Sequence, residues 1–276
     1  RPCRTPIPSG FDVSMFKKAL SALVGSKRGF AVPDGQRVYA IGDVHGRGDL
    51  LETLLGKIEA DNRERGPADT RLVFLGDLID RGPASRQVIE TIMGLRARSG
   101  TFRVDVLKGN HEELFLRALD GDRDALRLFD KCGGRETMES YGIDPEEAES
   151  GGWDDLLDRM AAAVPAEHRR FLEDAPDFLT IGDYFFVHAG IRPERPIDQQ
   201  DPADMRWIRR EFLSYEGRLE KMVVHGHSVS TSVQELPHRI GIDTGAYRTG
   251  NLTALGLEGT TLWYLSTNPE GAGERA

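Results

Sequence analysis

Three short motifs decide how this chain folds: Gly42-Asp43-Val44-His45-Gly46, Gly76-Asp77-Leu78-Ile79-Asp80-Arg81-Gly82 and Gly109-Asn110-His111-Glu112. Each motif directly follows a short apolar run that is typical of a buried strand, at residues 38–41, 72–75 and 104–107. Apolar residues recur at helical spacing between these runs, which predicts parallel strands joined by right-handed crossover helices. The side chains of Asp43, His45, Asp77, Asn110 and His111 are therefore expected along the carboxyl edge of one sheet, where open α/β sheets bind their ligands.

The rest of the chain divides into regions that differ in composition and in the spacing of their apolar residues. Residues 1–36 predict a proline-rich arm followed by a short amphipathic helix. A single main domain is expected over residues 37–267, with a helical insertion at about 112–177. From residue 178 the pattern returns to short strands, which favours a second, mixed or antiparallel sheet packed on the first. The polar, glycine-rich tail at 268–276 is expected to be flexible.

The composition is that of a soluble globular protein, with 39% hydrophobic and 29% charged residues. The formal net charge of −9 argues against a broad basic surface for nucleic acid, although a local cleft for phosphate remains compatible with it. No apolar run reaches the roughly 18–20 residues that span a bilayer. The two cysteines, Cys3 and Cys132, do not make a disulfide framework and favour a reducing compartment. We therefore expect a cytoplasmic protein, whose oligomeric state the sequence does not predict.

Histidines in the second half of the chain also end apolar strands. His188 follows the run 185–187, and His225 and His227 follow the run 222–224. A single histidine at a strand end is usually structural, but recurrence of His, Asp or Asn at five strand ends favours a metal site at one edge. Ligands of these types suit Mn²⁺, Zn²⁺ or Fe²⁺ rather than the thiolate sites of structural zinc.

The motifs also resemble those of a known family. Gly-Asp-x-His-Gly, Gly-Asp-x-x-Asp-Arg-Gly and Gly-Asn-His-Glu occur in the order seen in the phosphoprotein phosphatases, a branch of the calcineurin-like metallophosphoesterases. His-Ala-Gly at His188 and Gly-His at His227 extend the resemblance, which covers residues 38–265 and is similar to the bacterial type. It implies the α/β metallophosphoesterase fold, a four-layer α/β/β/α sandwich with a helical insertion.

The resemblance further implies two divalent cations, Mn²⁺ first, with Fe or Zn as alternatives. In the family pattern Asp77 bridges the two cations. One cation is then held by Asp43 and His45, and the other by Asn110, His188 and His227. His225 lies outside the pattern and is expected as a strand-end residue or a neighbour of the ligands.

A hydrolytic mechanism follows from this resemblance. Two cations about 3.5–4 Å apart can activate a bridging hydroxide, which would attack phosphorus directly. His111 is adjacent to Asn110, and adjacent side chains diverge, so His111 is expected as the general acid for the leaving group. Asp80 is expected to orient His111 and to raise its pKa.

Arginines are expected to bind the phosphate oxygens. Arg81 follows Asp80 directly and can form paired hydrogen bonds with a phosphate. The segment 205–210 offers a second arginine, and Arg209 resembles the position used in bacterial members. Arg206 and Arg210 are instead expected to be solvated. The turn at 241–245 is interpreted as structural.

These observations predict a phosphatase that hydrolyses phosphomonoesters, with phosphoserine and phosphothreonine in proteins as substrates. An alternative is a hydrolase of diadenosine tetraphosphate or related dinucleoside polyphosphates, in which Trp153, Trp207 or Tyr247 could stack on a nucleobase. A second alternative is an inactive scaffold on the same fold, which the intact set of ligand positions disfavours.

Overall fold

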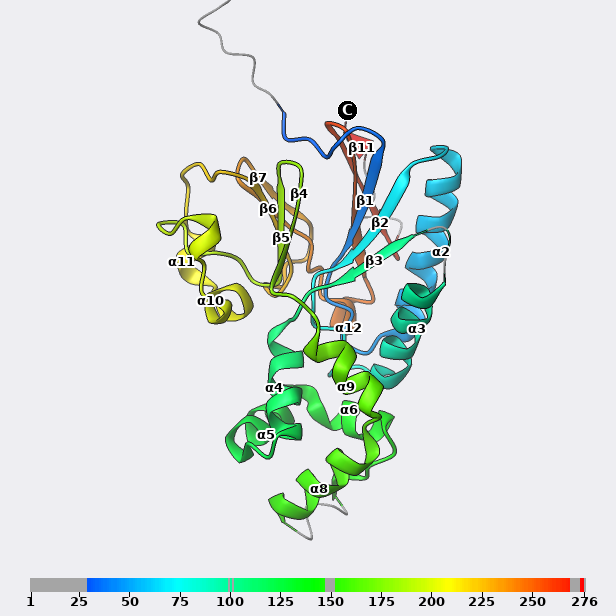
Figure 1. The fold of residues 1–276 in the computed structure, drawn as a ribbon, viewed down its shortest axis with the longest axis vertical. Helices are drawn as coiled ribbons and strands as arrows, with labels where there is room; N and C mark the ends of the chain where they lie inside the picture. The colour runs from blue at the N-terminus through cyan, green and yellow to red at the C-terminus, as the bar shows by residue number, and fades with distance from the viewer. Residues whose placement is uncertain (1–28, 99, 101, 147–151, 269–273, 276) are drawn as a thin grey trace, which may run out of the picture.

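The computed structural model describes residues 29–98, 100, 102–146, 152–268 and 274–275 (Figure 1). The predicted arm and its amphipathic helix lie almost wholly outside these residues, as does Cys3. Most of the predicted tail also lies outside them. Within the described residues, no helix is both long enough and apolar enough to cross a membrane.

The first sheet contains the three strands that precede the motifs. Its order is β11-β10-β9-β1-β2-β3. The strands are β1 (Gln36–Ile41), β2 (Asp69–Phe74), β3 (Arg103–Val106), β9 (Thr253–Glu258), β10 (Thr261–Ser266) and β11 (Glu274–Arg275). β1, β2 and β3 are parallel, as predicted, and the helices α2 (Gly48–Glu64) and α3 (Ser85–Ala97) connect them.

The position of the C-terminal hairpin corrects one expectation. All the short strands after residue 178 are predicted in the second sheet, but β9 pairs antiparallel with β1 and thereby joins β10 to the first sheet. The pairing covers the edge of β1 that β2 leaves open. An uncovered edge strand would present unpaired backbone groups to solvent.

The second sheet is mixed and has the order β4-β5-β6-β8-β7. Its strands are β4 (Phe178–Ile181), β5 (Tyr184–Val187), β6 (Met222–His225), β7 (Gln234–Leu236) and β8 (Arg239–Gly241). β5, β6 and β8 are parallel neighbours, whereas β4 and β7 are antiparallel edge strands. The strand ends that carry His188 and His227 therefore belong to the second sheet, as expected, and they meet the three motifs at one edge of the sandwich, where Nε2 of His188 lies 3.3 Å from Oδ1 of Asp77.

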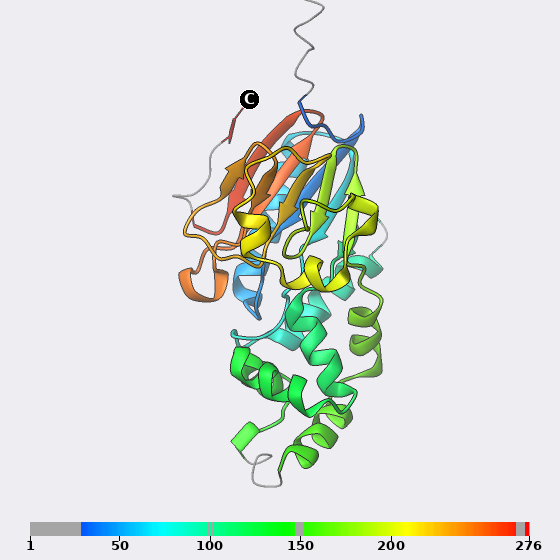
Figure 2. The same ribbon diagram turned by 90° about the vertical axis from the view of Figure 1, so that its left-hand side faces the viewer.

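Alternating side chains explain the layers of the sandwich. In β1, Val38 and Ala40 pack between the two sheets, whereas Tyr39 and Ile41 pack against α2 and α3. In β5, Phe186 faces the first sheet and Phe185 faces α10 (Pro202–Trp207) and α11 (Arg210–Leu213). Figures 1 and 2 show these helices outside the second sheet, which completes the predicted four-layer α/β/β/α sandwich.

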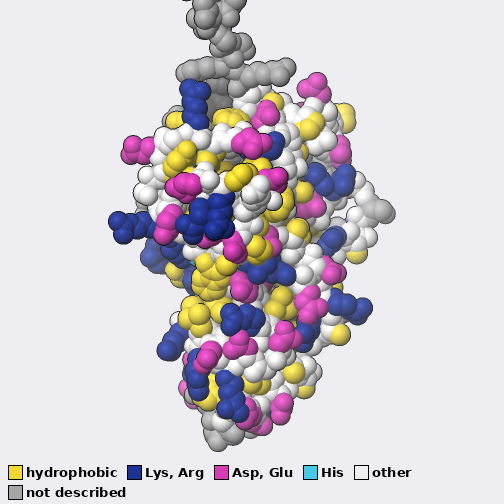
Figure 3. Space-filling view, turned by 60° about the vertical axis from the view of Figure 1, so that its left-hand side comes forward, with side chains coloured by type: hydrophobic (Ala, Val, Ile, Leu, Met, Phe, Trp, Pro, Cys, Tyr) yellow, Lys and Arg dark blue, Asp and Glu magenta, His cyan; other side chains and the backbone are white. Residues whose placement is uncertain are grey.

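The helical insertion lies below the sandwich, at the end where the parallel strands finish (Figures 1 and 2). Its elements are α4 (Asn110–Leu119), α5 (Arg123–Phe129), the π-helix η1 (Asp130–Gly134), α6 (Arg135–Ser140), α8 (Trp153–Ala163) and α9 (Ala166–Glu173). Buried apolar residues from these helices are continuous with the core beneath α2 and α3. On the face shown in Figure 3, acidic and basic side chains are interspersed over both the sandwich and the insertion.

Candidate metal centre and active site

The backbone is strained where the motifs leave their strands. Among the described residues, the non-glycine residues with positive φ all belong to the predicted site: His45, Asp77, Asp80, Arg81 and His227, with φ between 47° and 74°. Each such conformation costs of order 1–3 kcal/mol and persists only where the surroundings enforce it. Strain concentrated in this way points to a functional role for these turns.

Two glycines allow carboxylates to lie against the backbone. A Cβ on Gly109 would collide with Oδ1 of Asp77, and a Cβ on Gly226 would collide with Oδ1 of Asp43. Glycine is therefore required at these positions for close packing rather than for a turn, since the φ of Gly109 is −88°.

Asp77 stands at the centre of the cluster. Its Oδ1 lies 3.3 Å from Nε2 of His188, and its Oδ2 lies 3.6 Å from Nε2 of His45 and 3.7 Å from Nε2 of His111. Two groups of possible metal ligands share this carboxylate, one with His45 and His111 and the other with His188 and His227. An aspartate shared by two groups is the arrangement that a bridged pair of cations needs.

Asn110, His188 and His227 meet on one side of Asp77. Oδ1 of Asn110 lies 3.0 Å from Nε2 of His188, which is also 3.2 Å from Nδ1 of His227. Nδ1 of His188 lies 2.9 Å from the carbonyl oxygen of Leu75, and this contact fixes the ring with Nε2 toward the cluster. Nε2 of His227 is buried without a hydrogen-bond partner among the described residues.

Asp43 is buried as well, but among the described residues it belongs to neither of these two ligand groups. Both Asp43 oxygens accept a hydrogen bond from the backbone N–H of His227, at 3.0 and 3.2 Å. His45 instead lies beside His111, with ring centroids 4.7 Å apart. The carbonyl oxygen of Ile79 orients the His45 ring through Nδ1 at 2.9 Å.

The pKa of His111 differs in direction from the pKa values of the other histidines in the cluster. Burial lowers the pKa of His45 to about 3 and that of His227 to about 2. Burial also lowers the pKa of His188. These rings are neutral at pH 7, as a metal ligand must be.

His111 has the opposite electrostatic environment. Burial works to lower its pKa, but the carboxylates of Asp77 and Asp80 raise the pKa to about 9. Nδ1 of His111 lies 2.5 Å from Oδ2 of Asp80. A histidine that is protonated at neutral pH can donate a proton and is a poor metal ligand.

Asp80 is held by residues from two helices. The hydroxyl of Thr137 in α6 donates to Oδ1 of Asp80 at 2.6 Å, and the hydroxyls of Thr137 and Ser85 both accept from the Asp80 backbone N–H. Both helical residues are fully buried. The insertion therefore contributes directly to the site.

Arg81 lies between two histidines of the cluster. Its Nη1 is 2.8 Å from Nε2 of His45, and its Nη2 is 3.0 Å from Nε2 of His111. The guanidinium lies 4.6 Å above the ring of Tyr247, in the short helix α12 (Ala246–Thr249). The backbone N–H of Arg81 donates to the carbonyl oxygen of Gly133 at 2.8 Å, which is a second contact from the insertion.

The arginines at 206–210 differ in their surroundings. Arg206 is not solvated as expected, because its guanidinium pairs with Asp177 at 2.6 Å and with Glu113 at 3.4 Å. Arg209 is exposed at the start of α11, and its charge helps to lower the pKa of His188 and of His227. Arg209 therefore lies near the cluster with its side chain open to solvent.

Glu112 has a structural role that was not predicted from the sequence. Its buried carboxylate accepts hydrogen bonds from the backbone N–H groups of Asp77, Leu78 and Gly109, at 2.8–2.9 Å. These bonds tie the second motif to the third. A glutamate at the third position of a helix is a capping signal that could have indicated this contact.

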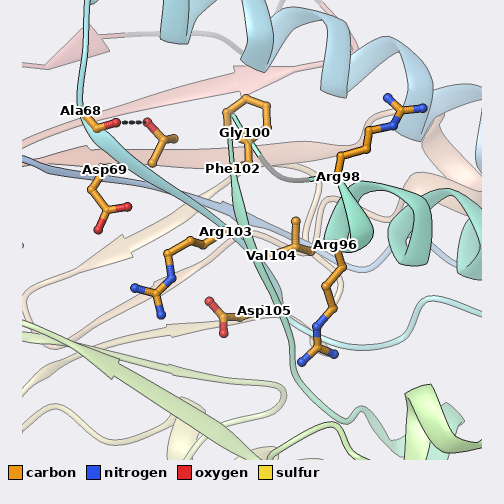
Figure 4. Close-up of a pocket in the computed structure, with 10 residues that line it drawn as sticks. Ala68, Asp69, Arg96, Arg98, Gly100, Phe102, Arg103, Val104 and Asp105 are labelled. Atoms are coloured by element: carbon orange, nitrogen blue, oxygen red, sulfur yellow. Dashed lines mark hydrogen bonds between the residues drawn. The ribbon is translucent and has the colours of Figure 1, made fainter.

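Two other features contribute no side chain to either ligand group. His225 contacts Arg239 and the carbonyl oxygen of its neighbour Gly226, so it is a strand-end residue as expected. A polar cavity of about 460 Å³ opens near the start of β2 and β3, at the end of the sheet opposite the motifs. Figure 4 shows Arg96, Arg98 and Arg103 diverging around this cavity, and their guanidinium groups do not meet on one ligand position.

The fold and the cluster agree with the comparison to known families. A model described as calcineurin-like phosphoesterase matches residues 36–252. The chain belongs to this family, and it is a metal-dependent phosphoesterase. Its narrower placement among the phosphoprotein phosphatases stays a prediction.

Individual relatives refine this picture. The chain is 27% identical over 235 residues to the asymmetrical bis(5'-nucleosyl)-tetraphosphatase of Anoxybacillus flavithermus, and the match covers 78% of this chain and 88% of the relative. Its fold is similar to that of a protein proposed to be a diadenosine tetraphosphatase, with a TM-score of 0.58, 22% identity, and coverage of 87% and 95% of the two chains. A cold-active protein tyrosine phosphatase gives a TM-score of 0.57, 21% identity, and coverage of 85% and 78%. At these identities the two solved structures establish the fold alone.

Proposed function

We propose that this protein hydrolyses dinucleoside tetraphosphates at a dinuclear metal centre. The observation that carries the proposal is the relationship to an asymmetrical bis(5'-nucleosyl)-tetraphosphatase along 88% of that relative's length. The phosphoprotein substrate predicted from the motifs has no comparable support, because the likeness to a protein tyrosine phosphatase extends to the fold alone. Phosphoprotein hydrolysis remains the second candidate.

The proposed ligands follow the clusters around Asp77. Asp77 would bridge the two cations, with Asn110, His188 and His227 holding one of them and Asp43 and His45 holding the other. Their Asp, Asn and neutral His donors suit two divalent cations of the Mn²⁺, Fe²⁺ or Zn²⁺ type, and we propose Mn²⁺. When bound, such a pair supplies an activated water and stabilises the charge that develops on phosphorus.

Arg81 and Arg209 bind the phosphate chain of the substrate, and His111 donates the proton to the leaving group. Arg81 and Arg209 bind phosphate oxygens from two sides, since one comes from the second motif and the other from α11. His111, protonated at neutral pH and held by Asp80, donates a proton to the leaving oxygen. For a tetraphosphate this oxygen belongs to a nucleotide, whose low basicity makes it a better leaving group than the alkoxide of a phosphoserine.

Two aromatic side chains lie near this machinery. Tyr247 contacts His45 and Arg81 through its ring. Trp207 is 36% exposed, and its indole N–H donates to Glu113 in α4 at 2.9 Å. Trp153 begins α8, and this helix lies at the far end of the insertion in Figure 1. Tyr247 and Trp207 are therefore better placed than Trp153 to contact a nucleobase.

The test is a product analysis with Mn²⁺-loaded protein. Diadenosine tetraphosphate is expected to yield AMP and ATP, the products of asymmetrical cleavage, and EDTA or the substitution Asp77→Asn should abolish the reaction. Two molecules of ADP would instead indicate symmetrical cleavage by the same centre. Release of phosphate from a phosphoserine peptide, with the tetraphosphate left intact, would overturn the proposal.

A further inference from the structure

The turn after β8 carries Asp243, whose carboxylate lies beside the proposed metal centre. Asp243 is not one of the six proposed ligands. We propose that Asp243 is an additional metal-site carboxylate, which binds the cation on the Asp43 side and determines how tightly that cation is held. This inference rests on the proposed metal centre, but not on the identity of the substrate.

Asp243 is buried and only half satisfied. Asp243 is only 3% exposed to solvent. Oδ1 accepts a hydrogen bond from the backbone N–H of Gly245 at 3.0 Å, whereas Oδ2 has no hydrogen-bond partner among the described residues. A buried carboxylate oxygen without a donor is costly unless a cation or a proton compensates it.

The backbone brings Asp243 next to two proposed ligands. A Cβ on Gly42, the residue before Asp43, would approach the carbonyl oxygen of Ile242 to 2.6 Å, so the first motif and the turn are in contact. The carbonyl oxygen of Asp243 accepts from the backbone N–H of Ser230, in the loop that follows His227. Asp243 thus lies at the junction of the Asp43 and His227 loops.

Two buried carboxylates at this junction repel each other. Asp43 is 2% exposed, and both its oxygens accept a hydrogen bond from the backbone N–H of His227. Among the described residues no arginine hydrogen bonds to Asp243, and the guanidinium of Arg81 lies beside His45 and His111 instead. A divalent cation between the carboxylates would remove the repulsion and satisfy the free oxygen.

Metal titration of the Asp243→Asn variant tests the inference without any substrate. The asparagine keeps an oxygen that can accept from Gly245, so the turn is preserved while the charge is lost. Calorimetric titration of the metal-free proteins with Mn²⁺ should show one of two sites weakened at least tenfold and the other unchanged. Affinities within twofold of the wild type at both sites would overturn the inference.

Two further measurements keep the result interpretable. Asp105→Asn removes a carboxylate at the opposite end of the sheet and should leave Mn²⁺ binding unchanged. A crystal structure of the wild type with Mn²⁺ provides a test that does not depend on a variant. Asp243 should contact the cation on the Asp43 side there, and an Asp243 side chain turned away from both cations would overturn the inference. A protein that binds Mn²⁺ through Asp243 but does not cleave dinucleotides would contradict only the proposed function.

Discussion

Thr137 and Asp80 are joined by two hydrogen bonds that connect the helical insertion to the second motif. The Thr137 hydroxyl donates to Oδ1 of Asp80 at 2.6 Å and accepts from the Asp80 backbone N–H at 2.9 Å. Oδ2 of the same carboxylate contacts His111. A residue 57 positions away along the chain therefore positions the carboxylate that holds the proposed acid.

Thr137→Val should lower activity by releasing Asp80. The valine keeps the shape of the side chain but removes both hydrogen bonds, which costs about 1–3 kcal/mol of stability. Because Asp80 then holds the His111 proton less firmly, the alkaline limb of the pH–rate profile should move to lower pH. Thr137→Ser should restore the profile, whereas a valine variant with an unshifted profile would show that Thr137 is only structural.

The loss of activity caused by substituting His111 should depend on the leaving group of the substrate. His111→Asn removes the proton donor, and a poor leaving group such as the alkoxide of phosphoserine needs that proton more than a nucleotide does. The fall in kcat/KM should therefore be larger for a phosphoserine peptide than for diadenosine tetraphosphate. Equal falls on both substrates, with metal content preserved, would argue against His111 as the acid.

Protonation of His111 should also stabilise the metal-free protein at low pH. The pKa of His111 is raised from 6.5 to about 9 in the folded state, so its contribution is fully present below pH 6.5 and is lost as the pH rises to about 9. Urea denaturation at pH 6 and pH 9.5 measures this loss. The stability difference between wild type and His111→Asn should shrink at pH 9.5, and a constant difference would contradict the raised pKa.

Gly109→Ala should disrupt the centre without a change of charge. The added methyl group would occupy the position of Oδ1 of Asp77, so the carboxylate must move away from the histidines. We expect at least one cation to be lost, measured as bound metal per protein chain. Gly56→Ala is the matched control, because a Cβ there meets nothing within 4 Å and a helical alanine stabilises by up to about 1 kcal/mol.

The two arginines near the site should behave differently. Arg209 is exposed, so Arg209→Ala should lower kcat/KM by about 10²-fold, as for other donors to developing phosphate charge, with little change in stability. Arg206→Ala breaks contacts to Asp177 and Glu113 and should cost about 1–3 kcal/mol of stability. Denaturation and steady-state kinetics on both variants measure the contrast. A loss of stability for Arg209→Ala together with a loss of kcat/KM for Arg206→Ala would show that Arg206, not Arg209, binds the phosphate.

The fold can be predicted from the sequence where an apolar run is followed directly by residues that can bind a metal. β1, β2 and β3 are short apolar runs, each followed by Asp, His or Asn, and both their parallel pairing and their motif ends follow from that pattern. The sheet membership of β9 does not follow, because an apolar strand that is buried on both faces fits either sheet. β7 is exposed at all three positions and has no alternation to detect.

Residues that support the site from a distance are the hardest to predict. Thr137 lies in a helix whose sequence has no motif, and its contact with Asp80 depends on how the insertion packs. Asp243 belongs to a glycine-rich turn that is interpreted as structural from sequence, and only its burial and unpartnered oxygen indicate more. Such contacts arise from tertiary packing, which local periodicity does not record.

The ratio of kcat/KM for diadenosine tetraphosphate to that for a phosphoserine peptide, measured with the Mn²⁺-loaded wild type, tests the central claim most directly. A ratio of at least about 10², equivalent to about 2.7 kcal/mol of transition-state stabilisation, is the result we predict. A ratio below one would contradict the proposed substrate and favour the phosphoprotein.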